Sequence, residues 1–127
     1  MAPGSPSARP ILVAGALLAA TGVMAGAFGS HGLRGLLDAQ ALGWWQTAVQ
    51  YQLWHAIALV AFAALPVRAG WPAALIGAGT IIFSGTLYVM ALTGLRWLGA
   101  VTPAGGALLI AGWLLLAYRA WRDAERS

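Results

Sequence analysis

The feature that most constrains this chain is an uncharged apolar run at positions 11–29. As a helix, a run of 19 residues rises about 28 Å, close to the hydrocarbon thickness of a bilayer, about 30 Å. A secretory signal peptide is the alternative, with Arg9 as its basic start and residues 25–27 as its cleavage site. Because the run exceeds the usual apolar signal region of about 7 to 15 residues, we expect a retained membrane span.

Three more apolar stretches follow, each bounded by turn-forming, charged or tryptophan residues. Trp71 and Trp97 stand at two of these boundaries, where an indole prefers the headgroup region. Only 8% of the chain is charged, against roughly 25% in a soluble domain, so it lacks the material for a water-exposed surface. We predict an all-α, polytopic membrane protein with four transmembrane helices. The predicted spans are residues 11–29, 47–65, 71–93 and 98–118.

The segment between the first two predicted spans, residues 31–44, has a different pattern. Its leucines recur at spacings of three and four, with charged residues between them, which is typical of an amphipathic helix. We therefore expect a short surface helix over 31–44, with Leu33, Leu36 and Leu37 turned to the apolar side. Residues 1–10 are predicted to be a flexible lead and residues 119–127 a polar tail.

The seven arginines act as topology markers. They are spread singly between apolar stretches, so they form no patch of the kind that binds nucleic acid, and we expect no nucleic-acid partner. Four spans place both termini on one side of the membrane. The positive-inside rule then makes that side the cytoplasmic side of the cell (inner) membrane. Arg9, Arg68, Arg119, Arg122 and Arg126 lie on the terminal side, and Arg34 and Arg96 on the other.

Four sequence blocks resemble the successive signatures of the YgdD-like family of small bacterial inner-membrane proteins, which has eukaryotic relatives and is a domain of unknown function. They follow the family's order and spacing over residues 11–118, with Ser30 where many relatives have Ala. The resemblance implies four spans and an integral membrane location, and it implies no activity. The blocks are GAFGSHGL (26–33), TAVQYQLWHA (47–56), FSGTLYVMALTG (83–94) and LGAVTPAGGALLIAGW (98–113).

The second predicted span carries the densest set of polar side chains. Thr47, Tyr51 and His55 lie at i, i+4 and i+8, and the third span repeats this spacing with Thr80, Ser84 and Tyr88. Unpaired polar groups in hydrocarbon cost several kcal/mol, so these residues should face other helices. His31 follows the first span. The candidate polar cluster is therefore His55, Tyr51, Gln52, Thr47, Ser84, Tyr88 and His31.

Three hypotheses account for this cluster. The favoured one is interhelical packing, with hydrogen bonds of about 0.6 kcal/mol each. His55 is then neutral and bonded to Tyr88, Ser84 or the first span, with Gln52 one turn away as a local alternative. The second is a small carrier or channel in which His55 relays protons. The third is a haem- or quinone-associated redox subunit, which needs His31 and His55 at the same depth in the membrane. A shared metal would require both imidazoles within about 2 Å of it, but His31 is expected near the interface and His55 well inside the core. We expect no cofactor and no metal.

Small residues on the predicted helices favour close helix packing, since lipid supplies no hydrophobic drive between helices. Homo-oligomerisation is the alternative use of such residues. The candidate helix-packing positions are Gly22, Gly26, Gly85, Gly105 and Gly106.

The catalytic repertoire of the chain is narrow. It has no cysteine, no acidic residue within a predicted span and no nucleophile–histidine–acid set. We therefore predict no enzymatic activity and favour a helix-packing or accessory membrane protein. The expected partners are the lipid bilayer and either another membrane protein or a second copy of the chain.

Overall fold

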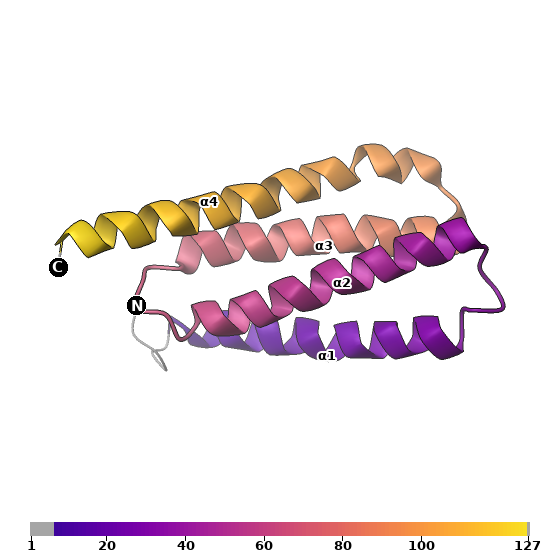
Figure 1. Cartoon of the computed structure of the whole chain (residues 1–127), viewed down its shortest axis with the longest axis horizontal. Coiled ribbons are helices and arrows are strands. Elements are labelled where there is room, and N and C mark those ends of the chain that lie inside the picture. The colour runs from indigo at the N-terminus through magenta and orange to yellow at the C-terminus, as the bar shows by residue number, and fades with distance from the viewer. Residues whose placement is uncertain (1–6, 127) are drawn as a thin grey trace.

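The computed structural model describes residues 7–126, which fold into four long helices and one short 3₁₀ helix. The helices run antiparallel in turn, so the start of α1, the α2–α3 connection and the end of α4 lie at one end (Figure 1). Among the described residues, three stretches are long and apolar enough to cross a membrane: Arg9–His31, Gly70–Thr93 and Arg96–Glu125. The elements are α1 Arg9–His31, α2 Ala39–Phe62, α3 Gly70–Thr93, η1 Arg96–Ala100 and α4 Thr102–Arg126.

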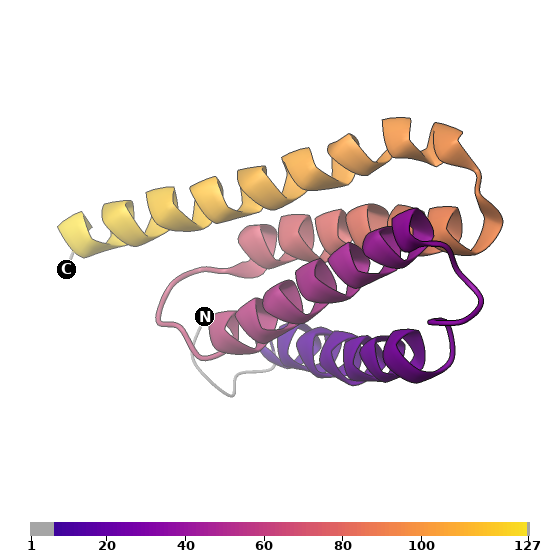
Figure 2. The same ribbon diagram turned by 45° about the vertical axis from the view of Figure 1, so that its right-hand side comes forward.

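Each long helix packs mainly on the next one in the sequence. α1 lies against α2, α2 against α3 and α3 against α4, while α1 and α4 make no backbone contact within the described chain. Figures 1 and 2 show the resulting row, which stays open between α1 and α4. One buried cluster joins α2, α3 and α4 through Leu59 and Phe62 of α2, Ile76 of α3 and Leu109 of α4.

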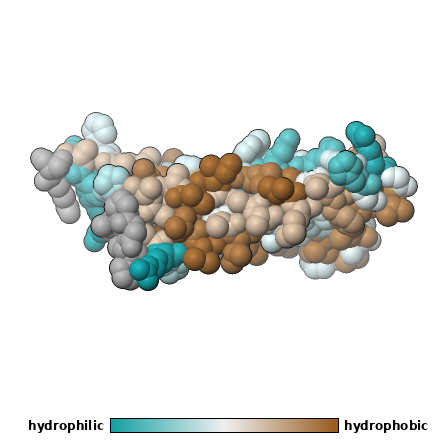
Figure 3. Space-filling view, turned by 90° about the horizontal axis from the view of Figure 1, so that it is seen from below, coloured by the Kyte–Doolittle hydropathy of each residue, from teal (hydrophilic) through white to brown (hydrophobic). Residues whose placement is uncertain are grey.

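The outer surface of the row is apolar. Leu17 on α1, Ile57 on α2, Ile81 on α3 and Leu114 on α4 are all exposed. Seen from the α1 side, apolar residues form a band across the middle of the molecule, with hydrophilic residues gathered near its ends (Figure 3). A surface of this kind suits a lipid solvent, because exposed apolar area on this scale is unfavourable in water.

Local chemistry explains where the helices begin and end. Pro10 stands in the first turn of α1 and Pro103 in that of α4, where a missing N–H costs nothing. The Asp38 carboxylate accepts a hydrogen bond from the Ala41 N–H at 2.8 Å and so caps α2. α3 ends at Thr93 and is capped by Gly94, whose φ of 74° is left-handed and favours glycine.

The predicted surface helix over residues 31–44 is wrong. α1 continues to His31, residues 32–38 form turns, and α2 starts at residue 39. Within the turns, the Leu36 and Leu37 N–H groups both donate to the Leu33 carbonyl at 3.0 Å. The leucine spacing therefore reflects one hydrogen-bonded turn. Leu33 is buried as predicted for the apolar side, whereas Leu36 is 77% exposed.

Helix bounds differ most from the predicted spans at α2 and α4. α1 and α3 extend the spans 11–29 and 71–93 by at most two residues at either end. α2 begins eight residues before position 47, because the Asp38 cap starts the helix there. α4 begins at Thr102 and runs through the predicted polar tail, which is therefore helical as far as Arg126.

The predicted flexible lead, residues 1–10, overlaps the start of α1. Its residues 1–6 lie outside the described part of the chain, and its last two, Arg9 and Pro10, already belong to α1.

Candidate functional site

Gln52, buried midway along α2, links three helices through its amide. Its Nε2 donates to the Leu18 carbonyl at 2.9 Å and to Thr21 Oγ1 at 2.8 Å, both on α1. The Tyr88 hydroxyl of α3 donates to Gln52 Oε1 at 2.6 Å. Both amide hydrogens and the carbonyl oxygen are engaged, as burial of an amide requires. The Thr21 hydroxyl in turn donates to the Leu17 carbonyl at 2.8 Å.

Two further hydrogen bonds connect α2 to α1 and α3, both in the part of α2 that precedes Gln52. Ser84 Oγ of α3 donates to the Ala48 carbonyl at 2.7 Å, and Trp45 Nε1 donates to the Ala25 carbonyl of α1 at 2.8 Å. The Trp45 ring also lies edge-on to Tyr88, with ring centroids 4.6 Å apart. Together with Gln52, these bonds hold α1, α2 and α3 in register.

His55 is buried one turn beyond Gln52, and both of its ring nitrogens are hydrogen-bonded. Nδ1 lies 2.7 Å from the Tyr51 carbonyl, and Nε2 accepts from Trp113 Nε1 of α4 at 3.2 Å. These partners select the neutral tautomer with its proton on Nδ1, because a carbonyl only accepts and an indole N–H only donates. The predicted partners, which were Tyr88, Ser84, the first span or the nearby Gln52, are wrong.

Trp113 reaches His55 from α4, a helix that is not adjacent to α2 in the row. The α2 and α4 backbones do not touch within residues 7–126, so the contact depends on the size of the indole. The Trp113 ring also packs edge-on to Phe62, with centroids 5.4 Å apart at 89°. His55 thus fixes the side of α4 that turns towards α2.

The side chains of Tyr51, Thr47 and His31 make none of these hydrogen bonds, although the Tyr51 carbonyl is a partner of His55. Tyr51 stacks on His55 at 16° and packs on Phe83, with centroids 4.3 Å apart, and Thr47 is half-buried on α2. His31 is exposed at the end of α1.

The two histidines lie at different depths. α2 starts beside the loop that follows His31, and His55 comes 16 residues later, a rise of about 24 Å. The geometry needed for a shared redox centre is therefore not formed. Among the described residues, no group of three His, Asp or Glu side chains comes together to hold a metal.

Sequence reasoning missed three members of the network: Thr21, Trp45 and Trp113. Thr21 could have been noticed, because it is one of the few polar residues in an apolar run. Its residue type alone, however, does not predict which group it bonds to. The two tryptophans resemble membrane-interface residues in sequence. Their inward hydrogen bonds depend on helix rotations that the sequence pattern does not specify.

The predicted packing glycines divide into two groups. A methyl group added at Gly22 would lie 2.7 Å from Leu53, one at Gly26 3.3 Å from Val49, and one at Gly105 2.5 Å from the Phe83 nitrogen. These three therefore lie at close helix approaches. Gly85 faces open space and Gly106 makes only ordinary contact with Phe83. Close helix approaches also occur at Gly15, Gly29, Gly79 and Gly112.

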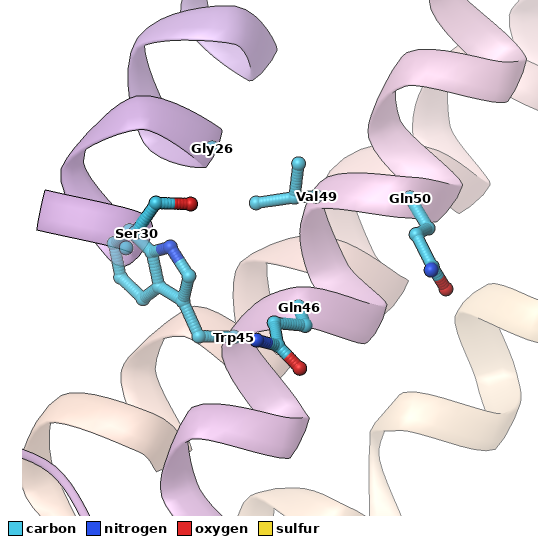
Figure 4. A pocket seen from close by; sticks show the side chains of 7 residues that line it. Gly26, Ser30, Trp45, Gln46, Val49 and Gln50 are labelled. Atoms are coloured by element: carbon cyan, nitrogen blue, oxygen red, sulfur yellow. The ribbon is translucent and has the colours of Figure 1, made fainter. Parts of the chain in front are cut away.

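Two small cavities flank the network. One of about 220 Å³ lies between α1 and α2, where Trp45 is directed towards Ser30 and Gln50 points away from α1 (Figure 4). The other, of about 190 Å³, touches Gln52, Ser84 and Tyr88, and His55 is not among its lining residues.

An apolar exterior around a hydrogen-bonded interior defines an α-helical integral membrane protein. The chain belongs to the family described as "Protein of unknown function (DUF423)", whose model matches residues 25–106. This confirms the resemblance to the YgdD-like family.

Named relatives agree with the membrane assignment. The UPF0382 membrane protein SH2409 of Staphylococcus haemolyticus is 42% identical over 83% of this chain and 89% of its own length. The UPF0382 membrane protein YwdK of Bacillus subtilis is 38% identical over 85% and 93%. The UPF0382 inner membrane protein YgdD of Escherichia coli is 36% identical over 87% and 88%. No solved structure matches this chain significantly.

Proposed function

We propose that this chain crosses the inner membrane four times, with α2 as the remaining span and both termini in the cytoplasm. α2 has 24 residues, as many as α3, and lies between α1 and α3. Its polar side chains lower its hydropathy, but Gln52 and His55 are buried and bonded inside the protein, where they do not meet lipid. The five-to-two arginine split supports the orientation.

Within the membrane, the protein acts by helix packing, as a non-enzymatic accessory or structural protein. The observation that carries this proposal is the occupancy of the buried polar groups: Gln52, His55 and Ser84 each bond to a group of the chain itself. A carrier or an enzyme needs polar groups turned towards a substrate. The apolar exterior remains as the surface for lipid or another membrane protein.

A flux assay separates this proposal from a proton-coupled carrier. Wild type, His55→Gln and the control His31→Gln, altered at an exposed residue, are reconstituted into vesicles with a pH-sensitive dye. We expect all three to leak protons no faster than protein-free vesicles, because both nitrogens of His55 are occupied. Wild-type flux that disappears in His55→Gln and persists in His31→Gln would establish the carrier instead.

A mass measurement tests the accessory role itself. Extraction in mild detergent followed by native mass spectrometry should give a stoichiometric complex heavier than the 13.1 kDa chain. A bare monomer in every mild detergent would contradict the proposal. An absorption band from a co-purified haem or quinone would favour the redox alternative.

A further inference from the structure

A basic cavity of about 490 Å³ lies at the end of the molecule that holds the α2–α3 connection. Arg68 of that connection and Arg119 of α4 both line it, together with Ser7, Gly70 and Trp71. Arg119 Nη1 donates to the Arg68 carbonyl at 2.9 Å, which ties the connection to α4. Two cationic residues from separate elements are thereby held around one cavity.

Within the described part of the chain, no carboxylate neutralises the positive charge of this cavity. Within residues 7–126, the ion pair at this end joins Arg122 to Asp123, and neither Arg68 nor Arg119 has a carboxylate within ion-pair distance. The adjoining start of α3 has no side-chain cap and no acidic residue in its first turn, so its dipole adds further positive potential. The cavity is therefore suited to a phosphate group.

A second, apolar cavity of about 270 Å³ adjoins the basic one, and Gly70 lines both. It runs between α1 and α3 and has no charged residue in its lining. Methyl groups added at Gly70 or Gly77 would meet nothing within 4 Å, so the space is open at both points. The lining residues are Pro10, Ile11, Ala14, Leu59, Gly70, Ala73, Ala74 and Gly77.

A cationic cavity joined to an apolar groove matches the two parts of one molecule, an anionic phospholipid. We propose that this composite site binds such a lipid, with its phosphodiester at Arg68 and Arg119 and an acyl chain in the groove past Gly77. Trp71, 67% exposed at the basic cavity, suits the headgroup level. Free phosphate would fill only the basic cavity, so the apolar groove favours the lipid.

The charge arm of the test uses the full-length protein in detergent, titrated with phosphatidylglycerol or with phosphatidylcholine of the same acyl chains. Wild type should prefer phosphatidylglycerol. Arg68→Gln and Arg119→Gln should each weaken phosphatidylglycerol binding about fivefold and leave phosphatidylcholine unchanged. The control Arg34→Gln, at the opposite end of the molecule, should change neither affinity. An equal loss in Arg34→Gln would overturn the site in favour of general charge attraction.

The groove arm compares two glycines of α3 that both face open space, Gly77 in the groove and Gly85 outside it. Gly77→Leu should weaken both lipids several-fold, while Gly85→Leu should not. Equal binding by Gly77→Leu and wild type would overturn the acyl-chain site.

Inorganic phosphate distinguishes the two sources of the anion. Millimolar phosphate should not displace phosphatidylglycerol, and displacement would assign the cavity to free phosphate. Thermal unfolding of each variant checks its fold. Should Arg119→Gln lose its fold with its bond to the connection, Arg68→Gln alone decides the charge arm, because only the Arg68 backbone takes part in that bond.

Discussion

Gln52 illustrates how a polar residue is accommodated midway along a helix whose neighbours are apolar. Its amide has two hydrogens and one carbonyl oxygen, and α1 and α3 supply a partner for each. These hydrogen bonds offset the free-energy cost of burying the amide, and they also connect three helices. His55 follows the same rule with two partners, one on its own helix and one on α4.

Replacing Gln52 tests this residue-scale account. Gln52→Leu removes three hydrogen bonds and leaves the Tyr88 hydroxyl without its acceptor, so we expect a loss of about 1–2 kcal/mol in unfolding free energy. Gln50→Leu, at an exposed position on the same helix, is the matched control and should change stability by less than about 0.5 kcal/mol. Unfolding in mixed detergent micelles measures both variants. Equal losses would show that the network contributes nothing specific.

At this scale the sequence predicted the residues better than their partners. Hydrogen-bonding side chains at i, i+4 and i+8 indicated that α2 turns a polar face inward, and Gln52 and His55 are both buried. The sequence did not indicate which helix lies opposite His55. Trp113 reaches it from α4, a contact that depends on the rotation and tilt of α4 rather than on any spacing along the chain.

Among the elements, uniformly apolar helices were the easiest to predict. α1 and α3 match their predicted spans to within two residues, because hydropathy changes sharply at both ends. α2 was predicted to begin too late, since its first turns mix apolar and polar residues as a surface helix does. The distinguishing feature is Asp38, whose cap starts one continuous helix.

The α3–α4 contact supports an element-scale prediction about glycine. A methyl group at Gly105 would lie 2.5 Å from the Phe83 nitrogen and 2.9 Å from the Gly79 carbonyl oxygen, and backbone atoms cannot rotate aside. Gly105→Ala should therefore separate the two helices and cost about 1–3 kcal/mol. Gly85→Ala, where the added methyl meets nothing, should be neutral or up to about 1 kcal/mol stabilising. Unfolding curves for Gly105→Ala and Gly85→Ala measure both effects. An unchanged unfolding free energy in Gly105→Ala would contradict the close approach of α3 and α4.

The whole molecule is a row of antiparallel helices with arginines collected at its two ends. Because α1 and α4 do not meet in the described chain, the row has two open sides, and its apolar band is available to lipid or to another membrane protein. The start of α1, the α2–α3 connection and the end of α4 share one end, so four crossings follow if α2 spans the bilayer. That crossing is the central claim of the account.

Single-cysteine labelling tests the crossing of α2 most directly, because the chain contains no cysteine of its own. Gly35→Cys lies in the loop before α2, Pro66→Cys in the connection after it and Glu125→Cys near the end of α4, all at exposed positions. In intact cells, a membrane-impermeant maleimide should label Gly35→Cys and should label Pro66→Cys and Glu125→Cys only after permeabilisation. Labelling of Gly35→Cys and Pro66→Cys from the same side would show that α2 does not cross and would contradict the account.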